Sequence, residues 1–320
     1  GHAHLAVLAK AGQLRSAGVE PTLIAPADFD YSGLATGVLS GALEPETARI
    51  DITALARANG VRHLATTVVG VDRDRRSLRL GDGAMETYDA ISFNIGSTVR
   101  DPDGWSVRDD VWPVKPLSSL SALHQKLRTA VLGGEVPSLA VAGDGQTGFE
   151  VAAALMGFHE RQGLRPVITL IGPSADAGWA PAHGRRYLTA TLDRRGLKRI
   201  AGTVAKRADR MVSLADGRTL PCDHLVLAAG LQAPPLTRDL GVPIDEAGRI
   251  RVAPTLSSVG DEGLFAVGDC ATVEGHPRPF AGVFGVRAAK TLIHNLCAVG
   301  TGSPQMGYRP QDRWLSIMDL

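Results

Sequence analysis

Two segments of the chain share one order of apolar and polar stretches. Residues 141–172, VAGDGQTGFEVAAALMGFHERQGLRPVITLIG, contain a short apolar run, a glycine turn, an amphipathic helical pattern and a second apolar run. This order predicts a strand, a helix and a further strand, which together form a βαβ unit. Residues 1–26, GHAHLAVLAKAGQLRSAGVEPTLIAP, have the same layout once Gly1 is aligned with Gly145. The pattern therefore repeats.

A second repeated pattern follows each of these segments. Residues 75–97, RRSLRLGDGAMETYDAISFNIGS, and residues 209–231, DRMVSLADGRTLPCDHLVLAAGL, each predict a strand, an Asp-Gly turn, a short strand and an apolar strand that ends in glycine. The aligned turn glycine and the strand-ending glycine are 95 positions apart in the first copy (96 − 1) and 85 in the second (230 − 145). The chain is therefore predicted to contain two copies of one domain plan.

The two copies differ at their beginnings. The run SLAVAGDG, residues 138–145, supplies a strand and Gly143 ahead of the second helix, and nothing equivalent precedes Gly1. We expect that the first copy lacks its first strand and the first glycine of its turn. The chain would then be truncated, or an N-terminal segment would precede it.

Composition indicates an ordinary globular protein. The chain has 320 residues, of which 44% are hydrophobic, and this length predicts about two domains. Lys and Arg total 34 against 33 Asp and Glu, a net charge of +1, which argues against nucleic acid or an anionic membrane surface as a partner. The apolar runs are too short to span a bilayer and no signal peptide is evident, which favours the cytoplasm unless a missing N-terminus carries a signal.

The cysteines predict no redox chemistry of their own. Cys222, Cys270 and Cys297 are far apart in the sequence and form no C-x-x-C pair. Neither a disulfide framework nor a dithiol redox motif is present. Any redox chemistry must therefore come from a cofactor.

The second copy carries the glycine pattern Gly143-x-Gly145-x-x-Gly148. In a βαβ unit such glycines form a tight turn and let a pyrophosphate approach the helix N-terminus, where free N–H groups and the helix dipole favour an anion. The alternative is a glycine turn needed only to pack the helix on the strand. Because the pattern follows a predicted strand and opens a predicted helix, we favour the dinucleotide site.

The sequence position that usually distinguishes an NADH site from an NADPH site does not indicate which of the two binds here. The acid that binds the ribose at the end of the second strand is absent from both copies, where Ala25 and Gly172 stand. Asp144, inside the second glycine turn, would repel a pyrophosphate unless its side chain points to solvent. Arg185 and Arg186 are candidates for a 2′-phosphate, or equally a solvated pair in a loop.

Seven segments carry a resemblance to a known family over nearly the whole chain. They are GHAH (1–4), YSGLATG (31–37), SFNIGS (92–97), VAGDGQTGFEVAAAL (141–155), LVLAAGLQAPP (225–235), GLFAVGDCA (263–271) and RPFAGVFGVRAAKTLIHNL (278–296). In this order they resemble the flavoproteins of the pyridine nucleotide-disulfide oxidoreductase superfamily, and within it the type II NADH dehydrogenase branch. The GHAH and YSG-x-x-x-G signatures are similar to those of the group sometimes fused to selenophosphate synthetase.

The resemblance implies an α/β fold of the glutathione reductase type, with two Rossmann-like dinucleotide-binding domains. An FAD-binding domain would comprise residues 1–115 and 235–320, interrupted by an NAD(P)H-binding domain at residues 116–234. In that family a C-terminal segment usually follows the point where this chain ends, at Leu320.

The resemblance also assigns the cofactor-binding residues. The N-terminal tetrapeptide would form part of the FAD pyrophosphate turn, and Asp269 would accept hydrogen bonds from the ribityl hydroxyls. The backbone of residues 280–283 would lie near the pyrimidine end of the flavin. The complete predicted set is Gly1, His2, Ala3, His4, Gly96, Gly143, Gly145, Gly148, Gly230, Gly268, Asp269, Gly282 and Val283.

Three of these residues, and Cys270 beside one of them, have alternative explanations. His2 and His4 are two residues apart and could form a metal pair, but no further ligands accompany them, so we expect no metal site. Asp269 is also placed to cap the next helix. Cys270 matches a frequent variant of the family's Gly-Asp motif, and we expect it to pack rather than to act as a nucleophile.

Two charged residues are the candidates for catalysis. Glu150 lies two residues beyond Gly148 and is expected in the first turn of the helix, where a carboxylate also suits the helix dipole. In the resembling dehydrogenases the matching glutamate lies near the flavin and the nicotinamide. Lys115 lies next to prolines where the chain should cross between domains, and would stabilise negative charge on reduced flavin. As a solvated linker lysine it would need no explanation.

The implied reaction is hydride transfer from NAD(P)H to FAD, followed by electron transfer to an acceptor. By resemblance the donor is NADH and the acceptor a quinone, with residues 31–41 near the quinone's entry. A disulfide substrate and sulfide oxidation are not expected, because the paired cysteines near the flavin are missing.

Two other functions stay open. One keeps the flavin chemistry with another acceptor, such as a ferredoxin-like protein or a small electrophile. The other is a dinucleotide-binding sensor or partner module without turnover. A homodimer, and peripheral contact with the inner face of a membrane through a C-terminal region absent from this chain, are compatible with the resemblance.

Overall fold

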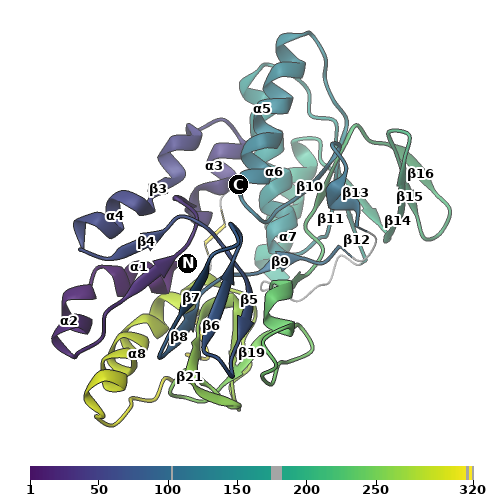
Figure 1. The fold of residues 1–320 in the computed structure, drawn as a ribbon. Helices are drawn as coiled ribbons and strands as arrows, with labels where there is room; N and C mark the ends of the chain where they lie inside the picture. Colours follow the sequence, from purple (N-terminus) through teal and green to yellow (C-terminus); the bar gives the residue numbers. More distant parts are fainter. Residues whose placement is uncertain (102–103, 174–181, 315–316, 319–320) are drawn as a thin grey trace. The chain divides into compact units, whose positions relative to one another are not determined.

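The computed structural model describes residues 1–101, 104–173, 182–314 and 317–318 (Figure 1). These residues form two compact units. Unit 1 comprises Gly1–Phe29, Ile50–Thr98 and the described residues from Leu231 to Trp314, and unit 2 comprises Asp30–Arg49, Val99–Gly230 and residues 317–318. The predicted domain boundaries fall instead after residues 115 and 234. Which nucleotide each domain binds stays a prediction.

Unit 2 is built on a five-stranded parallel sheet of order β10-β17-β11-β12-β13. Its strands and helices, in chain order, are β10 (Val111–Pro113), α5 (Ser118–Leu132), β11 (Leu139–Ala142), α6 (Gln146–Arg161), β12 (Ile168–Gly172), α7 (Ala182–Arg194), β13 (Lys198–Ala201) and β17 (His224–Leu227). In Figure 1, α6 lies beside β11 and β12, and α5 beside β10. The predicted βαβ unit of the second copy is confirmed.

The central strands of this sheet are buried along their whole length. All four residues of β11 and all four of β17 are buried, and Ala142 at the end of β11 pairs with Leu227. A continuous apolar strand of this kind is expected where helices cover both faces of a parallel sheet. Phe149, Leu155 and Phe158 of the helix α6 are also buried.

Shorter elements complete unit 2. An antiparallel sheet of β14 (Val204–Ala208), β15 (Met211–Leu214) and β16 (Thr219–Pro221) is inserted before β17. The remaining elements are η1 (Ser32–Leu34), α3 (Ala35–Leu39), η2 (Pro45–Ala48) and η3 (Trp105–Val107). The helix α3 packs against α5 and α6, so the segment Asp30–Arg49 belongs to this unit although it is distant in sequence.

Unit 1 contains a mixed sheet of order β22-β19-β20-β21-β8, with helices beside it. Its elements before residue 99 are α1 (His2–Leu8), α2 (Ala11–Ser16), β1 (Thr22–Ile24), α4 (Ile52–Ala58), β4 (Arg62–Leu64), β5 (Val68–Asp72), β6 (Ser77–Leu80), β7 (Met85–Thr87) and β8 (Ile91–Phe93). Those after residue 230 are η4 (Pro235–Arg238), β19 (Ile250–Val252), β20 (Ser257–Ser258), β21 (Asp261–Ala266), η5 (Gly268–Cys270), β22 (Ala271–Val273) and α8 (Gly282–Thr301). Four short strands lie at the unit boundaries: β2 (Asp28–Asp30), β3 (Arg49–Asp51), β9 (Thr98–Val99) and β18 (Leu231–Gln232).

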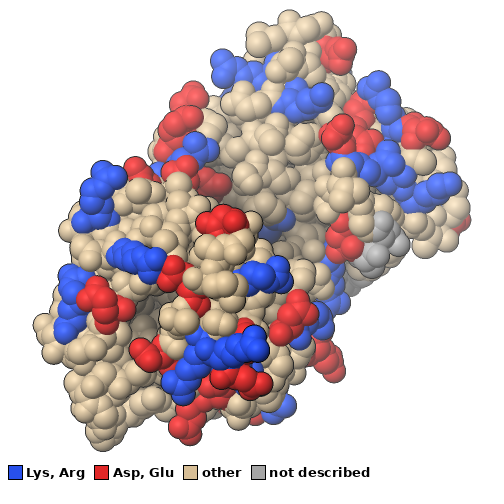
Figure 2. Space-filling model, in the orientation of Figure 1, with Lys and Arg blue, Asp and Glu red and all other residues tan. Residues whose placement is uncertain are grey.

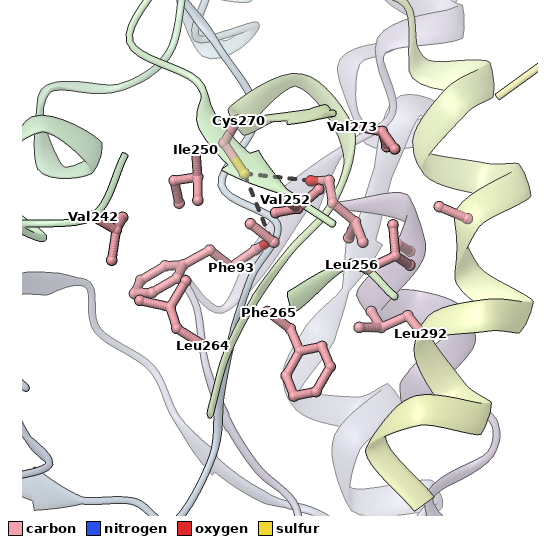
Figure 3. Packing of buried hydrophobic residues seen from close by; sticks show 14 of the residues in the cluster. Phe93, Val242, Ile250, Val252, Leu256, Leu264, Phe265, Cys270, Val273 and Leu292 are labelled. Atoms are coloured by element: carbon pink, nitrogen blue, oxygen red, sulfur yellow. Dashed lines mark hydrogen bonds between the residues drawn. The ribbon is translucent and has the colours of Figure 1, made fainter. Parts of the chain in front are cut away.

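Elements from the first and last parts of unit 1 meet in its core. The helices α1 and α8 pack against each other, and β8 pairs in parallel with β21. Figure 3 shows Phe93 of β8, Phe265 of β21 and Leu292 of α8 in one buried cluster. Phe265 and Leu292 have no exposed surface, so this cluster fixes α8 on the sheet.

The predicted hairpin repeat is present in both units. In unit 1, β5, β6 and β7 form a three-stranded antiparallel sheet that precedes the parallel strand β8, as β14, β15 and β16 precede β17 in unit 2. At the Asp-Gly turns, Gly83 has φ +87° and Gly217 φ +88°. The carboxylate of Asp82 accepts a hydrogen bond from the amide two residues on at 3.0 Å, and Asp216 does so at 3.1 Å. The α/β class with a duplicated plan is confirmed.

We predict that Leu292→Ala destabilises the protein much more than Val299→Ala, because both lie on α8 and only Leu292 is buried (Val299 is 43% exposed). A Leu→Ala change in a core costs about 2–5 kcal/mol, whereas an exposed substitution stays within about 0.5 kcal/mol. Urea unfolding followed by circular dichroism measures the difference. Equal losses for the two variants would contradict the packing described for α8.

Candidate functional site

The turn between β11 and α6 leaves no room for side chains at two of its glycines. Gly143 has φ +121°, and a Cβ atom there would lie 2.5 Å from the carbonyl oxygen of Ala228. A Cβ atom on Gly148 would lie 1.7 Å from the carbonyl oxygen of Gly143. The first and third glycines of the predicted pattern are therefore required by backbone contact, as the tight-turn and helix-packing roles of this fingerprint demand.

The turn also brings together the predicted glycines of two strands. Gly143 lies against Ala228 and Ala229, the two residues that follow β17, and Gly230 is the next residue in the chain. Gly230 has φ +75°, and its carbonyl oxygen accepts a hydrogen bond from the amide of Arg100 at 3.1 Å. The carboxyl ends of β11 and β17 therefore meet at one edge of the parallel sheet, which is where ligands bind in open α/β sheets.

The N-terminus of α6 has the features of an anion site. Its N-cap is Gly145, which has no side chain with which to cap the helix. The 16-residue length of α6 gives it a helix dipole with its positive end at this turn. The first-turn amides are donors that no intrahelical carbonyl satisfies, so these residues fit the pyrophosphate of a dinucleotide.

The side chain of Asp144 lies against the end of β12. A Cβ atom built on Gly172 would lie only 2.0 Å from Cγ of Asp144. From the sequence, an acid here was expected to be tolerable only if its side chain pointed to solvent. The residue is instead half-buried, and its carboxyl group is directed at β12. Asp144 therefore occupies the space of a side chain at position 172.

Glu150 lies deeper in α6 than predicted. The helix begins at Gln146 and has no acidic residue in its first turn, so the prediction that Glu150 lies there is wrong. Gly145 is the last extended residue, and the turn of Gln146 to Phe149 comes before Glu150. Because the dipole effect falls off within the first turn, it does not account for Glu150.

Lys115 follows the edge strand β10. The amide of Val114 still pairs with the carbonyl of Leu227 at 3.0 Å, and α5 begins at Ser118. Lys115 therefore lies at the same carboxyl edge of the sheet of unit 2 as Gly143 and Gly230, and it is half-buried.

Two residues of the segment 31–41, which was predicted near the entry of the acceptor, line a cavity of about 410 Å³ in unit 2. These are Thr36 and Ser40. Ala153 and Gly157 of α6 also line it, together with the charged residues Glu160, Arg161 and Arg195.

In unit 1, Asn94 connects the N-terminal segment to the Gly-Asp motif. Its Oδ1 atom accepts hydrogen bonds from the amides of Ala3 (3.1 Å) and His4 (3.3 Å), and its Nδ2 atom donates to the carbonyl of Val267 (2.9 Å). Gly1 lies so close that a Cβ atom there would be 2.5 Å from Oδ1 of Asn94. Asn94 is 8% exposed and was not singled out in the sequence, although it stands in the quoted segment SFNIGS.

The structure does not bring His2 and His4 together as a metal pair. The ring of His2 packs edge-on against Phe29 at 5.2 Å, whereas Nε2 of His4 lies 2.9 Å from Oγ of Ser92. Burial lowers the pKa of His4 to about 3, so its ring is neutral. Within the described residues, no three His, Cys, Asp or Glu side chains are grouped as metal ligands.

Asp269 stands directly after Gly268, which has φ +73° and lies against Asn94. The Oδ2 atom of Asp269 accepts a hydrogen bond from the hydroxyl of Ser97 at 2.7 Å. The short helix η5 has Val267 as its N-cap and no side-chain cap, so helix capping does not explain Asp269. Gly96, with φ +73°, completes the loop that carries Ser97.

The predicted residues Gly282 and Val283 are the first two of α8. The N-cap Ala281 offers no side-chain cap, so backbone donors at this helix end are available to a ligand. A cavity of about 40 Å³ is lined by Asp269, Phe280 and Ala281, among others. Arg249 also lines it, with its guanidinium 4.9 Å from the ring centroid of Phe280. No motif marks Arg249 in the sequence.

Charges of both signs are interspersed on the face shown in Figure 2. Several charged side chains of the described residues are paired in two-point contacts, such as Arg62 with Glu86 (2.8 and 2.7 Å) and Arg195 with Glu160 (both 3.0 Å). In the described part of the chain, no helix has the length and apolar character needed to cross a bilayer.

The family of the chain follows from a comparison with known proteins. The model of the pyridine nucleotide-disulphide oxidoreductase family matches residues 1–292. Its match covers both glycine turns, the Gly-Asp motif and most of α8. The chain belongs to the pyridine nucleotide-disulphide oxidoreductase family.

Individual relatives agree with this assignment. The NADH dehydrogenase-like protein MT1860 of Mycobacterium tuberculosis is 30% identical over 223 residues, which are 66% of this chain and 56% of that protein. The type II NADH:quinone oxidoreductase Ndh of the same species is 31% identical over 305 residues, 84% of this chain and 64% of that protein. The chain thus spans less than two thirds of either relative.

Solved structures agree on the fold. The ferredoxin reductase of the CYP199A2 system from Rhodopseudomonas palustris is 21% identical, with a TM-score of 0.76 over 97% of this chain and 76% of that protein. The fold with two Rossmann-like domains is therefore shared.

We predict that Cys297 is the most reactive thiol. Cys222 and Cys270 have no exposed surface and burial raises the pKa of each to about 11, whereas Cys297 is partly exposed. A raised pKa leaves little thiolate below pH 10, so the buried thiols react slowly. Labelling at pH 8 with a disulfide reagent should modify one thiol fast, and Cys297→Ser should abolish that phase. A fast phase that survives in Cys297→Ser would contradict the burial of the other two.

Proposed function

We propose that the protein is an FAD-dependent oxidoreductase that oxidises NADH and passes the electrons to a quinone. The observation that carries the proposal is the family match over residues 1–292, in which unit 2 supplies a glycine turn fitted to a dinucleotide. The relatives named above, an NADH dehydrogenase-like protein and a type II NADH:quinone oxidoreductase, support the donor and the acceptor. The domains proposed for FAD are residues 1–115 and 235–320, and that for NAD(P)H is residues 116–234.

The residues of unit 2 would bind and orient the nicotinamide dinucleotide. The first-turn amides of α6 would hold its pyrophosphate, and Gly145, where a Cβ atom would meet nothing within 4 Å, leaves the backbone open to it. In unit 1, Asp269, Gly268 and the N-terminus of α8 would hold the flavin dinucleotide. When bound, the two cofactors supply the redox chemistry.

The arrangement of residues around Asp269 fits the recognition of a hydroxyl-rich chain. Ser97 donates to one carboxylate oxygen of Asp269, and hydrogen bonding of this kind orients the group. The acceptor's proposed entry is the segment 31–41, where Thr36 and Ser40 line the cavity of about 410 Å³.

Anaerobic absorbance spectroscopy tests the proposal. We expect a flavin spectrum that NADH bleaches and that a water-soluble quinone restores. Restoration of the spectrum by a [2Fe–2S] ferredoxin alone would exclude a quinone as the acceptor and favour a protein acceptor. Flavin that neither NADH nor NADPH bleaches would exclude enzymatic NAD(P)H oxidation and favour a binding module.

Lys115 is proposed to compensate negative charge on the reduced flavin, and Lys115→Met tests this role. We predict that it slows the bleaching of flavin by NADH about 100-fold, the cost of removing one such donor. The matched control is Lys126→Met, on the exposed side of α5 in the same unit. Stopped-flow absorbance at equal flavin content measures the rates, and equal rates in both variants would exclude the role.

Glu150→Gln in the same assay distinguishes the two interpretations of Glu150. If Glu150 lies near the nicotinamide, the variant should bleach the flavin more slowly. If Glu150 is purely structural, the variant should change only the midpoint of unfolding. Glu135→Gln, exposed in the same unit, is the control.

A further inference from the structure

The end of β12 lacks the side chain that ordinarily recognises the adenosine ribose. In a βαβ unit, an acidic residue about 20 positions after the glycine turn hydrogen-bonds the ribose 2′-hydroxyl of NAD. Here that position is Gly172, 24 positions after Gly148 (172 − 148). Gly172 is buried, and its carbonyl oxygen accepts a hydrogen bond from the amide of Gly202 at 2.9 Å.

The space of the missing side chain is filled from the glycine turn. A Cβ atom on Gly172 would lie 2.0 Å from Cγ, 2.3 Å from Cβ and 2.4 Å from Oδ1 of Asp144. No pair of unbonded atoms tolerates such distances, so Asp144 and a side chain at position 172 exclude each other. The carboxyl group is thus present at the end of β12, but it comes from a different element.

We propose that Asp144 binds the adenosine ribose in place of the strand-end acid and makes the protein selective for NADH over NADPH. The proposal rests on the dinucleotide site proposed for unit 2. A carboxylate at this place accepts a hydrogen bond from a 2′-hydroxyl and repels a 2′-phosphate. The position of Asp144 also explains how an acidic residue is tolerated in the turn, because its carboxyl group is directed at β12.

Arg185 and Arg186 favour the opposite selectivity if they reach the ribose. Both lie on the helix α7 and not in a loop, with Arg185 half-buried and Arg186 exposed. A preference for NADPH that depends on these two arginines is therefore an outcome that would overturn the role of Asp144.

Calorimetric titration of the flavin-loaded protein with ADP-ribose and with 2′-phospho-ADP-ribose tests the proposal without turnover. We expect ADP-ribose to bind about 10- to 100-fold more tightly than its 2′-phosphate, the range for a hydrogen bond to a charged group. Asp144→Asn, which keeps the shape of the side chain, should weaken ADP-ribose binding by about the same factor and abolish the preference. Asp109→Asn, an exposed carboxylate of the same unit, should change neither affinity.

Moving the acid back to the strand provides a second test. The double variant Asp144→Gly with Gly172→Asp should restore the preference for ADP-ribose, whereas Gly172→Ala alone should lower the melting temperature because its Cβ meets Asp144. Should the double variant not fold, Asp144→Asn still tests whether Asp144 causes the preference for ADP-ribose.

The results distinguish failure of the proposed role of Asp144 from failure of the proposed function. Equal binding of both probes to the unmodified protein, or a preference that survives Asp144→Asn, would overturn the role of Asp144 alone. Binding of neither probe would overturn the dinucleotide site of unit 2, on which the proposed function depends.

Discussion

Close contact between the β11–α6 turn and its surroundings is the constraint on which the candidate site depends. The backbone at Gly148 approaches the carbonyl of Gly143 so closely that a Cβ atom would lie 1.7 Å from it. This contact packs α6 closely on the turn, and the helix begins at Gln146 after Gly145, which has no side chain to cap it. The same turn directs Asp144 at Gly172, so helix packing, anion binding and the contact with β12 have one physical origin.

Local patterns were sufficient to predict the repeated architecture. The Asp-Gly turns at Gly83 and Gly217 have nearly equal φ angles, because a two-strand hairpin of this type requires a left-handed residue at that point. The buried strands β11 and β17 were evident as apolar runs, and the glycine pattern fixed the turn between β11 and α6. These features depend on residues close in sequence, which is why the sequence alone predicts them.

Contacts between distant segments could not be predicted in this way. Asn94 accepts hydrogen bonds from α1, about 90 positions before it, and donates one to Val267, 173 positions after it. Arg249 reaches Phe280 through folding of the chain rather than through a motif. The packing of α3 on α5 and α6, which groups Asp30–Arg49 with unit 2, has no sequence signal either. Glu150 was expected in the first turn of α6, but the helix begins at Gln146 after Gly145, so Glu150 lies beyond that turn.

A crystal structure of the flavin-loaded protein with NAD⁺ bound would test directly whether the β11–α6 turn holds the dinucleotide. We expect the pyrophosphate on the first-turn amides of α6 and the carboxylate of Asp144 within about 3.2 Å of a ribose hydroxyl. NAD⁺ bound away from this turn, or a ribose turned away from Asp144 and β12, would contradict it.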